Sequence, residues 1–207
     1  MKVLQVLAGG THGGAEMAFV DMCQAMKDKG VDVSVITRPN KIRVPILRDC
    51  GLKTYTLPFG SMVDIYTPLA IKRIIRAEKP DIVQTWMSRA SQKTPNWNQT
   101  KIDKRYINIA RLGGYYKTNH FKNSDYFIAI TPDIKTYLVN EGVSSQRVRY
   151  INNFAETEKD SDPVNRESLD TPSDASILLT LARLHESKAL DVIIDALPDL
   201  PPPYHWI

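Results

Sequence analysis

Short apolar runs alternate with stretches of helical periodicity along the whole chain. The apolar runs predict strands at residues 3–8, 31–37, 53–57, 81–85, 106–110, 126–130, 147–151 and 176–182. The periodic stretches predict helices at residues 15–29, 66–78, 131–142 and 188–197. Strands that alternate with helices are typical of a doubly wound parallel sheet, so we expect an α/β, Rossmann-like fold. Ligands of such sheets collect at the carboxyl ends of the strands.

The pattern breaks at residues 155–175, which are rich in Glu, Asp, Ser and Pro and have no apolar period. We expect a linker there, between a domain at residues 1–154 and a second domain that begins at residue 176. One strand and one helix cannot cover their own apolar faces. Residues 176–207 are therefore predicted to be the first strand and helix of an incomplete domain.

Charge is unevenly distributed along the 207 residues, whose formal net charge is +4. The segment 89–123 holds eight basic residues and one acid, which gives it a charge of +7. Such a segment predicts either a surface that meets phosphates, acidic lipids or nucleic acid, or simply a solvated face. It contains no recognisable nucleic-acid-binding module, so we do not expect a nucleic-acid partner.

Other features of the sequence exclude several classes of protein. Two cysteines, Cys23 and Cys50, cannot build a disulfide scaffold or a zinc site. No apolar run approaches the roughly 18 residues that span a bilayer. The first eight residues have one positive charge and an apolar stretch too short for a signal peptide. A cytoplasmic location is expected.

Four of the ten glycines lie at residues 9–14, Gly-Gly-Thr-His-Gly-Gly, after the first predicted strand. A phosphate-binding Walker loop is excluded because Ala15 and Glu16 follow the last glycine. The glycine spacing differs from the dinucleotide fingerprint, and the second strand ends in Thr37-Arg38 rather than an acid, which argues against NAD but leaves NADP open. The loop either closes over a sugar or phosphate, the interpretation we favour, or is a tight turn without a ligand.

Two further strand ends carry rings and cations, which together can bind a sugar face and a phosphate. Trp86 and Arg89 follow the 81–85 strand, and Arg111, Gly113, Gly114 and Tyr115 follow the 106–110 strand. Core packing is the alternative explanation for the tryptophan. His12, in the glycine loop, has two interpretations. Either it acts as an acid, a base or a hydrogen-bond donor near neutral pH, or it is an exposed residue without a role.

Several segments, in this order and spacing, resemble the N-terminal domain of family 4 glycosyltransferases of the GT-B fold. They are residues 9–16, 80–86 (PDIVQTW), 125–131 (DYFIAIT) and 148–154 (VRYINNF). Residues 181–191 (LARLHESKALD) resemble the opening of that family's C-terminal domain. The most similar subgroup is bacterial enzymes of lipopolysaccharide or cell-surface glycan assembly.

The resemblance implies two Rossmann-like domains, with the acceptor bound mainly to the first and a nucleotide-sugar to the second. It implies a retaining transfer to a glycolipid or lipopolysaccharide-type acceptor. Carried over to this chain, the donor diphosphate and sugar would meet Gly13, Gly14, Arg183 and Lys188. The acceptor would meet Trp86, Arg89, Arg111, Gly113, Gly114 and Tyr115. Fixed cations neutralise the leaving diphosphate, so no metal and no cofactor beyond the nucleotide-sugar are expected.

The sequence departs from the family in two places. Many members carry a histidine soon after the strand equivalent to 106–110, whereas here the nearest is His120, so no catalytic residue is assigned. The family's second domain also continues for well over a hundred residues and supplies two glutamates to the donor. We therefore expect a fragment with an incomplete donor site and weak or absent catalysis. The alternative is a non-catalytic sugar- or lipid-binding remnant, and either protein is expected to contact the inner face of the cytoplasmic membrane. The sequence does not indicate an oligomeric state.

Overall fold

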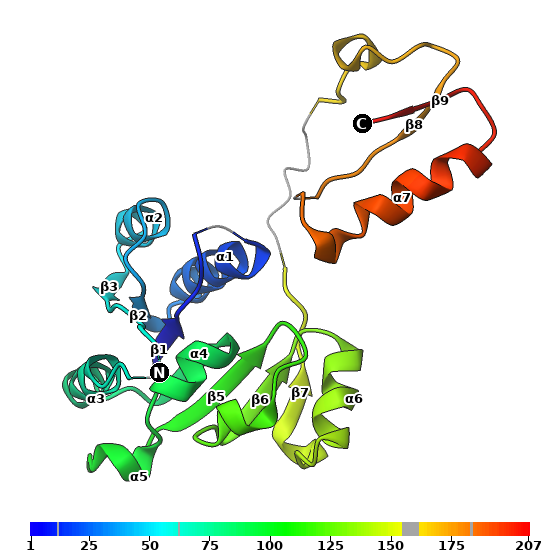
Figure 1. Cartoon of the computed structure of the whole chain (residues 1–207). Coiled ribbons are helices and arrows are strands. Elements are labelled where there is room, and N and C mark those ends of the chain that lie inside the picture. The colour runs from blue at the N-terminus through cyan, green and yellow to red at the C-terminus, as the bar shows by residue number, and fades with distance from the viewer. Residues whose placement is uncertain (12, 62, 155–161, 183) are drawn as a thin grey trace. The chain divides into compact units, whose positions relative to one another are not determined.

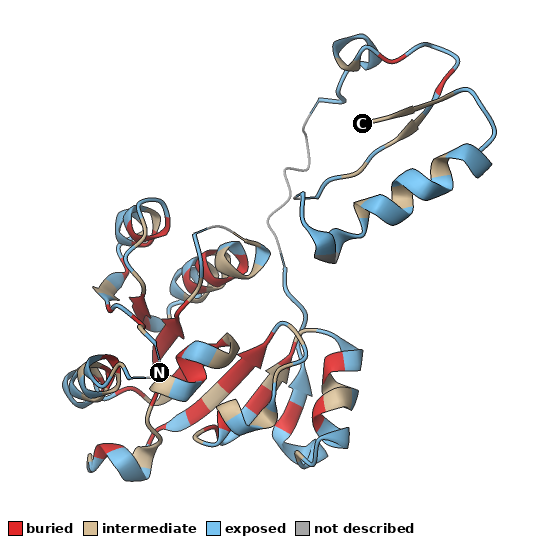
Figure 2. Cartoon of the chain, viewed as in Figure 1, coloured by how far each residue is buried: buried red, intermediate tan, exposed pale blue. Residues whose placement is uncertain are grey.

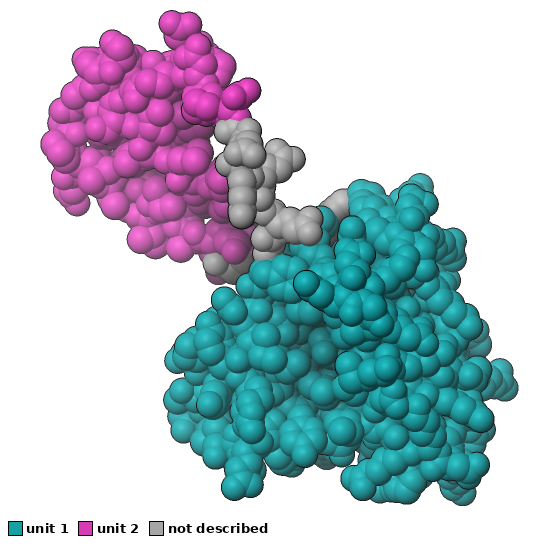
Figure 3. Space-filling model, turned by 180° about the vertical axis from the view of Figure 1, so that it is seen from behind, with its two compact units in different colours: residues 1–156 teal, residues 157–207 magenta. Residues whose placement is uncertain are grey.

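A computed structural model describes residues 1–11, 13–61, 63–154, 162–182 and 184–207. The chain forms two compact units, Met1–Glu156 and Thr157–Ile207, which Figure 3 colours teal and magenta. Each unit has its own sheet, so each is considered by itself. The second unit begins at Thr157, and it includes the described part (162–175) of the segment that the composition predicted as a linker.

A seven-stranded sheet forms the centre of unit 1, in the order β3-β2-β1-β4-β5-β6-β7. Every neighbouring pair in this sheet is parallel. The strands are β1 (Lys2–Leu7), β2 (Asp32–Thr37), β3 (Lys53–Thr56), β4 (Ile82–Trp86), β5 (Ile107–Leu112), β6 (Tyr126–Ala129) and β7 (Val148–Tyr150). The predicted α/β, doubly wound fold is confirmed (Figure 1).

Helices cover both faces of this sheet. They are α1 (Gly14–Asp28), α2 (Arg43–Asp49), α3 (Tyr66–Glu78), α4 (Met87–Lys93), α5 (Trp97–Thr100) and α6 (Pro132–Asn140). Helices α1 and α2 pack on one face, where Phe19 and Leu47 meet Leu7. On the other face, α3 packs Ile71 against Leu4, and α4 and α6 join the same layer. Figure 2 shows the buried residues concentrated on the central strands and on the inner sides of the helices.

Local sequence signals explain where the predicted helices begin and end. At the start of α6, Thr131 Oγ1 accepts a 3.1 Å hydrogen bond from the Ile134 N–H, as an N-cap residue should. Pro132 occupies the first position, where no intrahelical donor is needed. Beyond α1 and α6, Gly30 and Gly142 adopt φ values of +77° and +90°, in the region that glycine enters without strain.

The described residues of unit 2 form a two-stranded parallel sheet, one α-helix and short 3₁₀ helices. Strand β8 (Ser176–Leu178) pairs with β9 (Tyr204–Trp206), and α7 spans Leu190–Ala196. Strand β8 is shorter than the predicted 176–182, and β9 was not predicted because it follows a run of prolines. Trp206 Nε1 donates to Thr180 Oγ1 at 2.9 Å, which ties the end of β9 to the segment after β8. Among the described residues of the whole chain, no helix is both long and apolar enough to cross a bilayer.

Candidate functional site

Two adjoining pockets open at the edge of the unit 1 sheet where β1, β2 and β4 end. The first has a volume of about 680 Å³ and is lined by residues 9–11, 38–42 and 58; we call it the Arg38 pocket. The second, of about 290 Å³, is lined by residues 8–10, Arg38, 86–89 and Tyr116; we call it the Trp86 pocket. Strand order reverses between β1 and β4, which is where doubly wound sheets bind their ligands.

The glycine loop between β1 and α1 folds around the carboxylate of Glu16. Glu16 Oε1 accepts a 2.7 Å hydrogen bond from the Gly10 N–H. A Cβ atom at Gly9 would lie 2.8 Å from that oxygen, and one at Gly13 would overlap the same carboxylate. A side chain at position 9 or 13 would therefore displace the Glu16 carboxylate, so the close approach of these glycines has an internal cause that is independent of any ligand.

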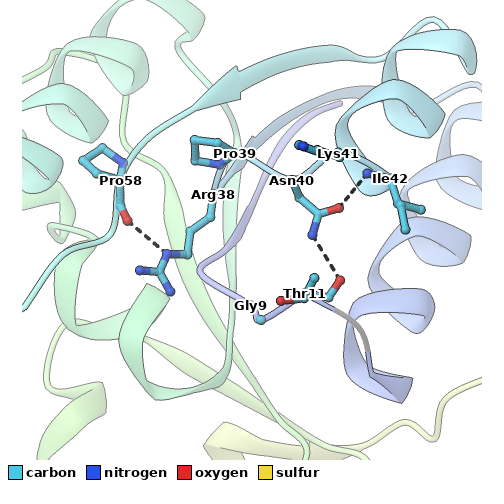
Figure 4. Close-up of a pocket in the computed structure, with 9 residues that line it drawn as sticks. Gly9, Thr11, Arg38, Pro39, Asn40, Lys41, Ile42 and Pro58 are labelled. Carbon is cyan, nitrogen blue, oxygen red and sulfur yellow. Dashed lines mark hydrogen bonds between the residues drawn. The ribbon is translucent and has the colours of Figure 1, made fainter.

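Asn40 joins the two loops that form the walls of the Arg38 pocket. Its Nδ2 donates a 3.0 Å hydrogen bond to the carbonyl of Thr11, on the glycine loop. Its Oδ1 accepts from the N–H groups of Ile42 at 3.0 Å and Arg43 at 2.7 Å, at the start of α2. Figure 4 shows this side chain between the two loops. One amide thus sets the spacing of both walls.

Two arginines near the carboxyl ends of these strands have different environments. Arg38 is half-buried at the end of β2, and its Nε donates to the Pro58 carbonyl at 3.0 Å (Figure 4). Arg43 is only 4% exposed and donates to Thr37 Oγ1 at 3.0 Å and to the Gly10 carbonyl at 3.1 Å. Burial lowers the pKa of Arg43, and the charge of Glu16 opposes that shift. Arg43 therefore supports the glycine loop from behind, while Arg38 lines both pockets.

Trp86 and Arg111, both predicted to bind the acceptor, lie in the interior. Trp86 is 3% exposed, and its Nε1 donates to Gln5 Oε1 at 2.8 Å. The Arg111 guanidinium lies 5.0 Å from the centre of that ring. Its Nη2 donates to the carbonyls of Ile151 and Asn152 and to Asn153 Oδ1, at 2.9–3.2 Å. Arg111 thus holds the chain beyond β7 against the sheet and does not line either pocket, whereas Trp86 forms part of a pocket wall.

The other predicted acceptor residues are more exposed. Arg89 lines the Trp86 pocket from α4. Gly113, Gly114 and Tyr115 follow β5 without lining either pocket; the Tyr115 hydroxyl bonds to the Asp133 carboxylate, which raises the pKa of that phenol. The next residue, Tyr116, lines the Trp86 pocket instead, and burial followed by the charge of Glu16 raises its pKa.

The predicted donor residues fall in both units. Gly13 is the N-cap of α1 and Gly14 its first residue, and neither lines the two pockets. Lys188 ends a short 3₁₀ helix, Glu186–Lys188, in unit 2 and is exposed. Arg183 lies outside the described residues, as does His12.

The basic segment 89–123 does not form one surface within the part of the chain that the structure describes. Arg89 lies at the carboxyl end of β4, whereas Lys104 pairs with Asp81 at the amino end of the same strand, at 2.7 Å. Lys93 turns inward and donates to the carbonyls of Ser61 and Asp64, at 3.0 and 2.7 Å. The charge of +7 is therefore divided among the carboxyl ends of the strands, their amino ends and the protein interior.

Sequence reasoning missed Asn40 and Lys41 as pocket residues, assigned an acceptor role to Tyr115 rather than to its neighbour Tyr116, and considered Arg38 only as a contact to NADP. A signal was present, because a polar Arg-Pro-Asn-Lys run at residues 38–41 follows the second strand. In a doubly wound sheet that strand end lies beside the glycine loop. Among the described residues, no group of three or more His, Cys, Asp or Glu side chains is placed to hold a metal ion.

A doubly wound parallel sheet with pockets at the carboxyl ends of its strands defines unit 1 as a Rossmann-like α/β domain. Residues 12–159 match the family described as Glycosyltransferase Family 4, and the chain belongs to that family. The predicted resemblance is thereby confirmed.

Individual relatives agree with this assignment. The chain is similar to the lipopolysaccharide core biosynthesis glycosyltransferase LpsE of Rhizobium meliloti (strain 1021), with 33% identity over 96% of this chain and 56% of LpsE. For LpsD of the same organism the identity is 28%, over 100% of this chain and 58% of LpsD. The structure of Anabaena Alr3699/HepE in complex with UDP-glucose has a TM-score of 0.74 at 16% identity, over 100% of this chain and 59% of HepE. The chain spans a little over half the length of these proteins.

Proposed function

We propose that the protein acts in a retaining glycosyltransferase that moves a sugar from a nucleotide-sugar to a glycan or glycolipid acceptor of the lipopolysaccharide type. The observation that carries this proposal is the pair of adjoining pockets at the switch point of the unit 1 sheet. The names of LpsE and LpsD, and the UDP-glucose bound to HepE, supply the substrate classes.

The donor side of the proposal rests on charge. Transfer breaks the bond between the anomeric carbon and the phosphate, so negative charge builds on the departing diphosphate. Helix N-termini and fixed cations stabilise such charge. We assign this role to Gly13 and Gly14 at the start of the 15-residue helix α1, and to Arg183 and Lys188, without a metal.

The acceptor side rests on unit 1. The Trp86 pocket presents the Arg89 cation and the half-buried Tyr116 ring, a combination that suits a sugar face and its hydroxyl groups. Gly113, Gly114 and Tyr115 follow β5, next to Tyr116 in the chain, and are proposed as further acceptor contacts. Trp86 and Arg111 support this surface from within, through the contact between their side chains.

A transfer assay tests the enzyme against the alternative of a non-catalytic sugar- or lipid-binding protein. The chain would be incubated with UDP-glucose, UDP-galactose or GDP-mannose and a lipopolysaccharide core acceptor, and the product's anomeric configuration read by NMR. We expect slow transfer with retention, and about tenfold lower kcat/KM for Arg89→Ala, with no change for the exposed control Arg48→Ala. Acceptor binding without transfer from any of these donors would favour the non-catalytic alternative.

We also propose peripheral contact with the inner face of the cytoplasmic membrane, made by residues 63–65 before α3 and by the first turn of that helix. Val63 and Ile65 are 84% and 76% exposed, and Tyr66 and Leu69 continue this apolar group. Lys93 fixes the loop that carries it through its bonds to the Ser61 and Asp64 carbonyls. Exposed apolar side chains followed by the cations of α3 suit the interface of an anionic bilayer.

Vesicle co-sedimentation tests this contact. Phosphatidylglycerol vesicles should bind the chain and phosphatidylcholine vesicles should bind it less. The double variant Ile65→Ser/Leu69→Ser should lose most of the binding, while Val139→Ser, an exposed apolar residue on α6, should not. Equal binding of the double variant and the parent protein would exclude this surface.

A further inference from the structure

We propose that the Arg38 pocket binds an anionic substituent, a phosphate or a carboxylate, carried by the acceptor glycan. The proposal rests on the proposed sugar transfer for the identity of the molecule that carries the anion. It assigns a ligand class to a pocket that the sequence did not predict, and it makes Arg38 a residue that determines acceptor specificity.

The charges of the pocket favour an anion. Its described lining contains two cations, Arg38 and Lys41, and no carboxylate. Arg89 adds a third cation in the adjoining Trp86 pocket. A neutral sugar offers hydroxyl groups that need acceptors as well as donors, whereas arginine and lysine side chains only donate. This lining therefore matches a phosphate or carboxylate better than an uncharged ring.

The carboxylate of Glu16 does not line the Arg38 pocket and is already hydrogen-bonded. Its Oε1 accepts from the Gly10 N–H. The buried Arg43 donates to the Gly10 carbonyl, and the charge of Glu16 opposes the lowering of the Arg43 pKa by burial. Glu16 is therefore partnered by the Gly10 N–H and acted on by the charge of Arg43, whereas Arg38 and Lys41 line a pocket whose described lining contains no carboxylate.

Arg38 is also held in one geometry. Its Nε donates to the Pro58 carbonyl, which fixes the plane of the guanidinium and leaves its terminal nitrogens for other partners (Figure 4). A planar guanidinium matches the two oxygens of a phosphate or carboxylate, and a fixed one loses less entropy when it binds. Because Arg38 is half-buried, water weakens its attraction for an anion less than it would at an open surface.

The pocket is large enough for more than an ion. Its volume of about 680 Å³ lies within the range of roughly 300–1,000 Å³ typical of small-molecule sites, so a sugar together with its charged group fits. Asn40 fixes the two walls relative to each other through its bond to Thr11. The pocket also continues into the Trp86 pocket, through the shared residues Gly9, Gly10 and Arg38, so one glycan can extend from one to the other.

Isothermal titration of the full chain with four probes tests the proposal. The probes are glucose 6-phosphate, glucuronate, glucose and inorganic phosphate, each at 50 and 300 mM salt. We expect the two charged sugars to bind at least tenfold more tightly than glucose and than inorganic phosphate, and to weaken as salt rises. Comparison of glucose 6-phosphate with glucuronate shows whether the pocket prefers a phosphate or a carboxylate on the sugar.

Variants connect the binding to Arg38. Arg38→Gln should weaken the charged sugar at least tenfold, Arg38→Lys less, and the exposed control Arg48→Gln not at all. Lys41→Ala, at an exposed position, should weaken binding of the charged sugar by a smaller factor. This variant still tests the pocket if an Arg38 variant fails to fold. Circular dichroism checks folding in each case.

Several outcomes would overturn the proposal. With the probes, they are equal affinities for glucose and glucose 6-phosphate, or an affinity for inorganic phosphate as high as that for the charged sugars. With the variants, the outcome is an unchanged affinity for the charged sugars in both Arg38→Gln and Lys41→Ala. Tighter binding of NADPH than of glucose 6-phosphate or glucuronate would also overturn it. The transfer assay is read separately. Sugar transfer with binding that does not depend on Arg38 defeats only this inference, and Arg38-dependent binding without transfer defeats only the proposed function.

Discussion

Asn40 donates a 3.0 Å hydrogen bond from its side chain to the backbone carbonyl of Thr11, 29 positions earlier in the chain. The bond connects the loop after β2 to the loop after β1, two segments that no regular secondary structure joins at this point. Because Asn40 Oδ1 also accepts from two N–H groups at the start of α2, the same side chain fixes a helix end and a pocket wall. The shape of the Arg38 pocket therefore depends on a residue that contributes no charge to it.

Replacing Asn40 should separate these two roles. Asn40→Ala should lower the free energy of unfolding by about 1–2 kcal/mol, since it removes a helix-start acceptor and a loop-to-loop donor. Asn40→Asp keeps the acceptor and loses only the donor, so it should cost less. Urea unfolding followed by tryptophan fluorescence measures both. Asn98→Ala, at an exposed site, serves as the control, and equal stabilities for Asn40→Ala and this control would contradict the role given to Asn40.

The two glycines predicted to face the donor should respond differently to alanine. A Cβ at Gly13 would overlap the Glu16 carboxylate, so Gly13→Ala should displace Glu16 from the Gly10 N–H and cost about 1 kcal/mol. At Gly14 no atom lies within 4 Å of an added Cβ, and the residue is the first of α1. Gly14→Ala should therefore stabilise by up to about 1 kcal/mol, as alanine does relative to glycine in helices. Thermal unfolding of the pair tests the contrast, and a loss of similar size in both variants would mean that the loop is constrained by something other than Glu16.

Most of the fold could be predicted from the sequence because the strands of unit 1 are short apolar runs with clear punctuation. Val3 to Ala8 are all buried, and the Thr131-Pro132 pair starts α6 as its chemistry requires. The helices α2, α4 and α5 were missed because they are short, at seven, seven and four residues. Helices of that length show too little periodicity to be recognised from the sequence and depend on tertiary contacts.

The site was less predictable for a different reason. Strand ends identified the correct edge of the sheet, but not which side chains turn into a pocket. Arg111 and Arg89 are equivalent as sequence features, yet Arg111 is 2% exposed and Arg89 is exposed in a pocket lining. The difference arises from the chain beyond β7, whose carbonyl groups engage Arg111, and such a contact between residues 40 positions apart leaves no local pattern.

Arg111 should therefore behave as a structural residue. Arg111→Met should lower the free energy of unfolding by about 1–3 kcal/mol, because it removes the hydrogen bonds that Arg111 Nη2 donates to the carbonyls of Ile151 and Asn152 and to Asn153 Oδ1. Arg89→Met should change stability by less than about 0.5 kcal/mol, as exposed substitutions usually do. Urea unfolding of the two variants makes the comparison. A stable Arg111→Met protein that has lost acceptor binding would instead support direct recognition by Arg111.

A buried carboxylate at the amino ends of the strands should make the free energy of unfolding depend on pH in the acid range. Glu78 pairs with Lys2 at 2.6 Å and Lys53 at 2.7 Å and also bonds to the Tyr55 hydroxyl. Burial by itself would raise the pKa of Glu78, but these bonds outweigh burial and hold the pKa at about 2, below its ordinary value of 4.5. Since the folded state binds the proton more weakly than the unfolded state, the stabilisation from Glu78 is complete above about pH 5. It is lost as pH falls from about 4.5 towards 2.

The variant Glu78→Gln isolates this contribution. At pH 7 it should be less stable than the parent protein by about 2 kcal/mol, since Lys2 and Lys53 lose their carboxylate. The difference should shrink as pH falls below about 4.5 and become small by about pH 2, where about half of the parent carboxyl is itself protonated. Urea unfolding at a series of pH values measures it, with the exposed Glu141→Gln as control. A difference that stays constant across this range would show that the charge of Glu78 contributes nothing and that only its shape matters.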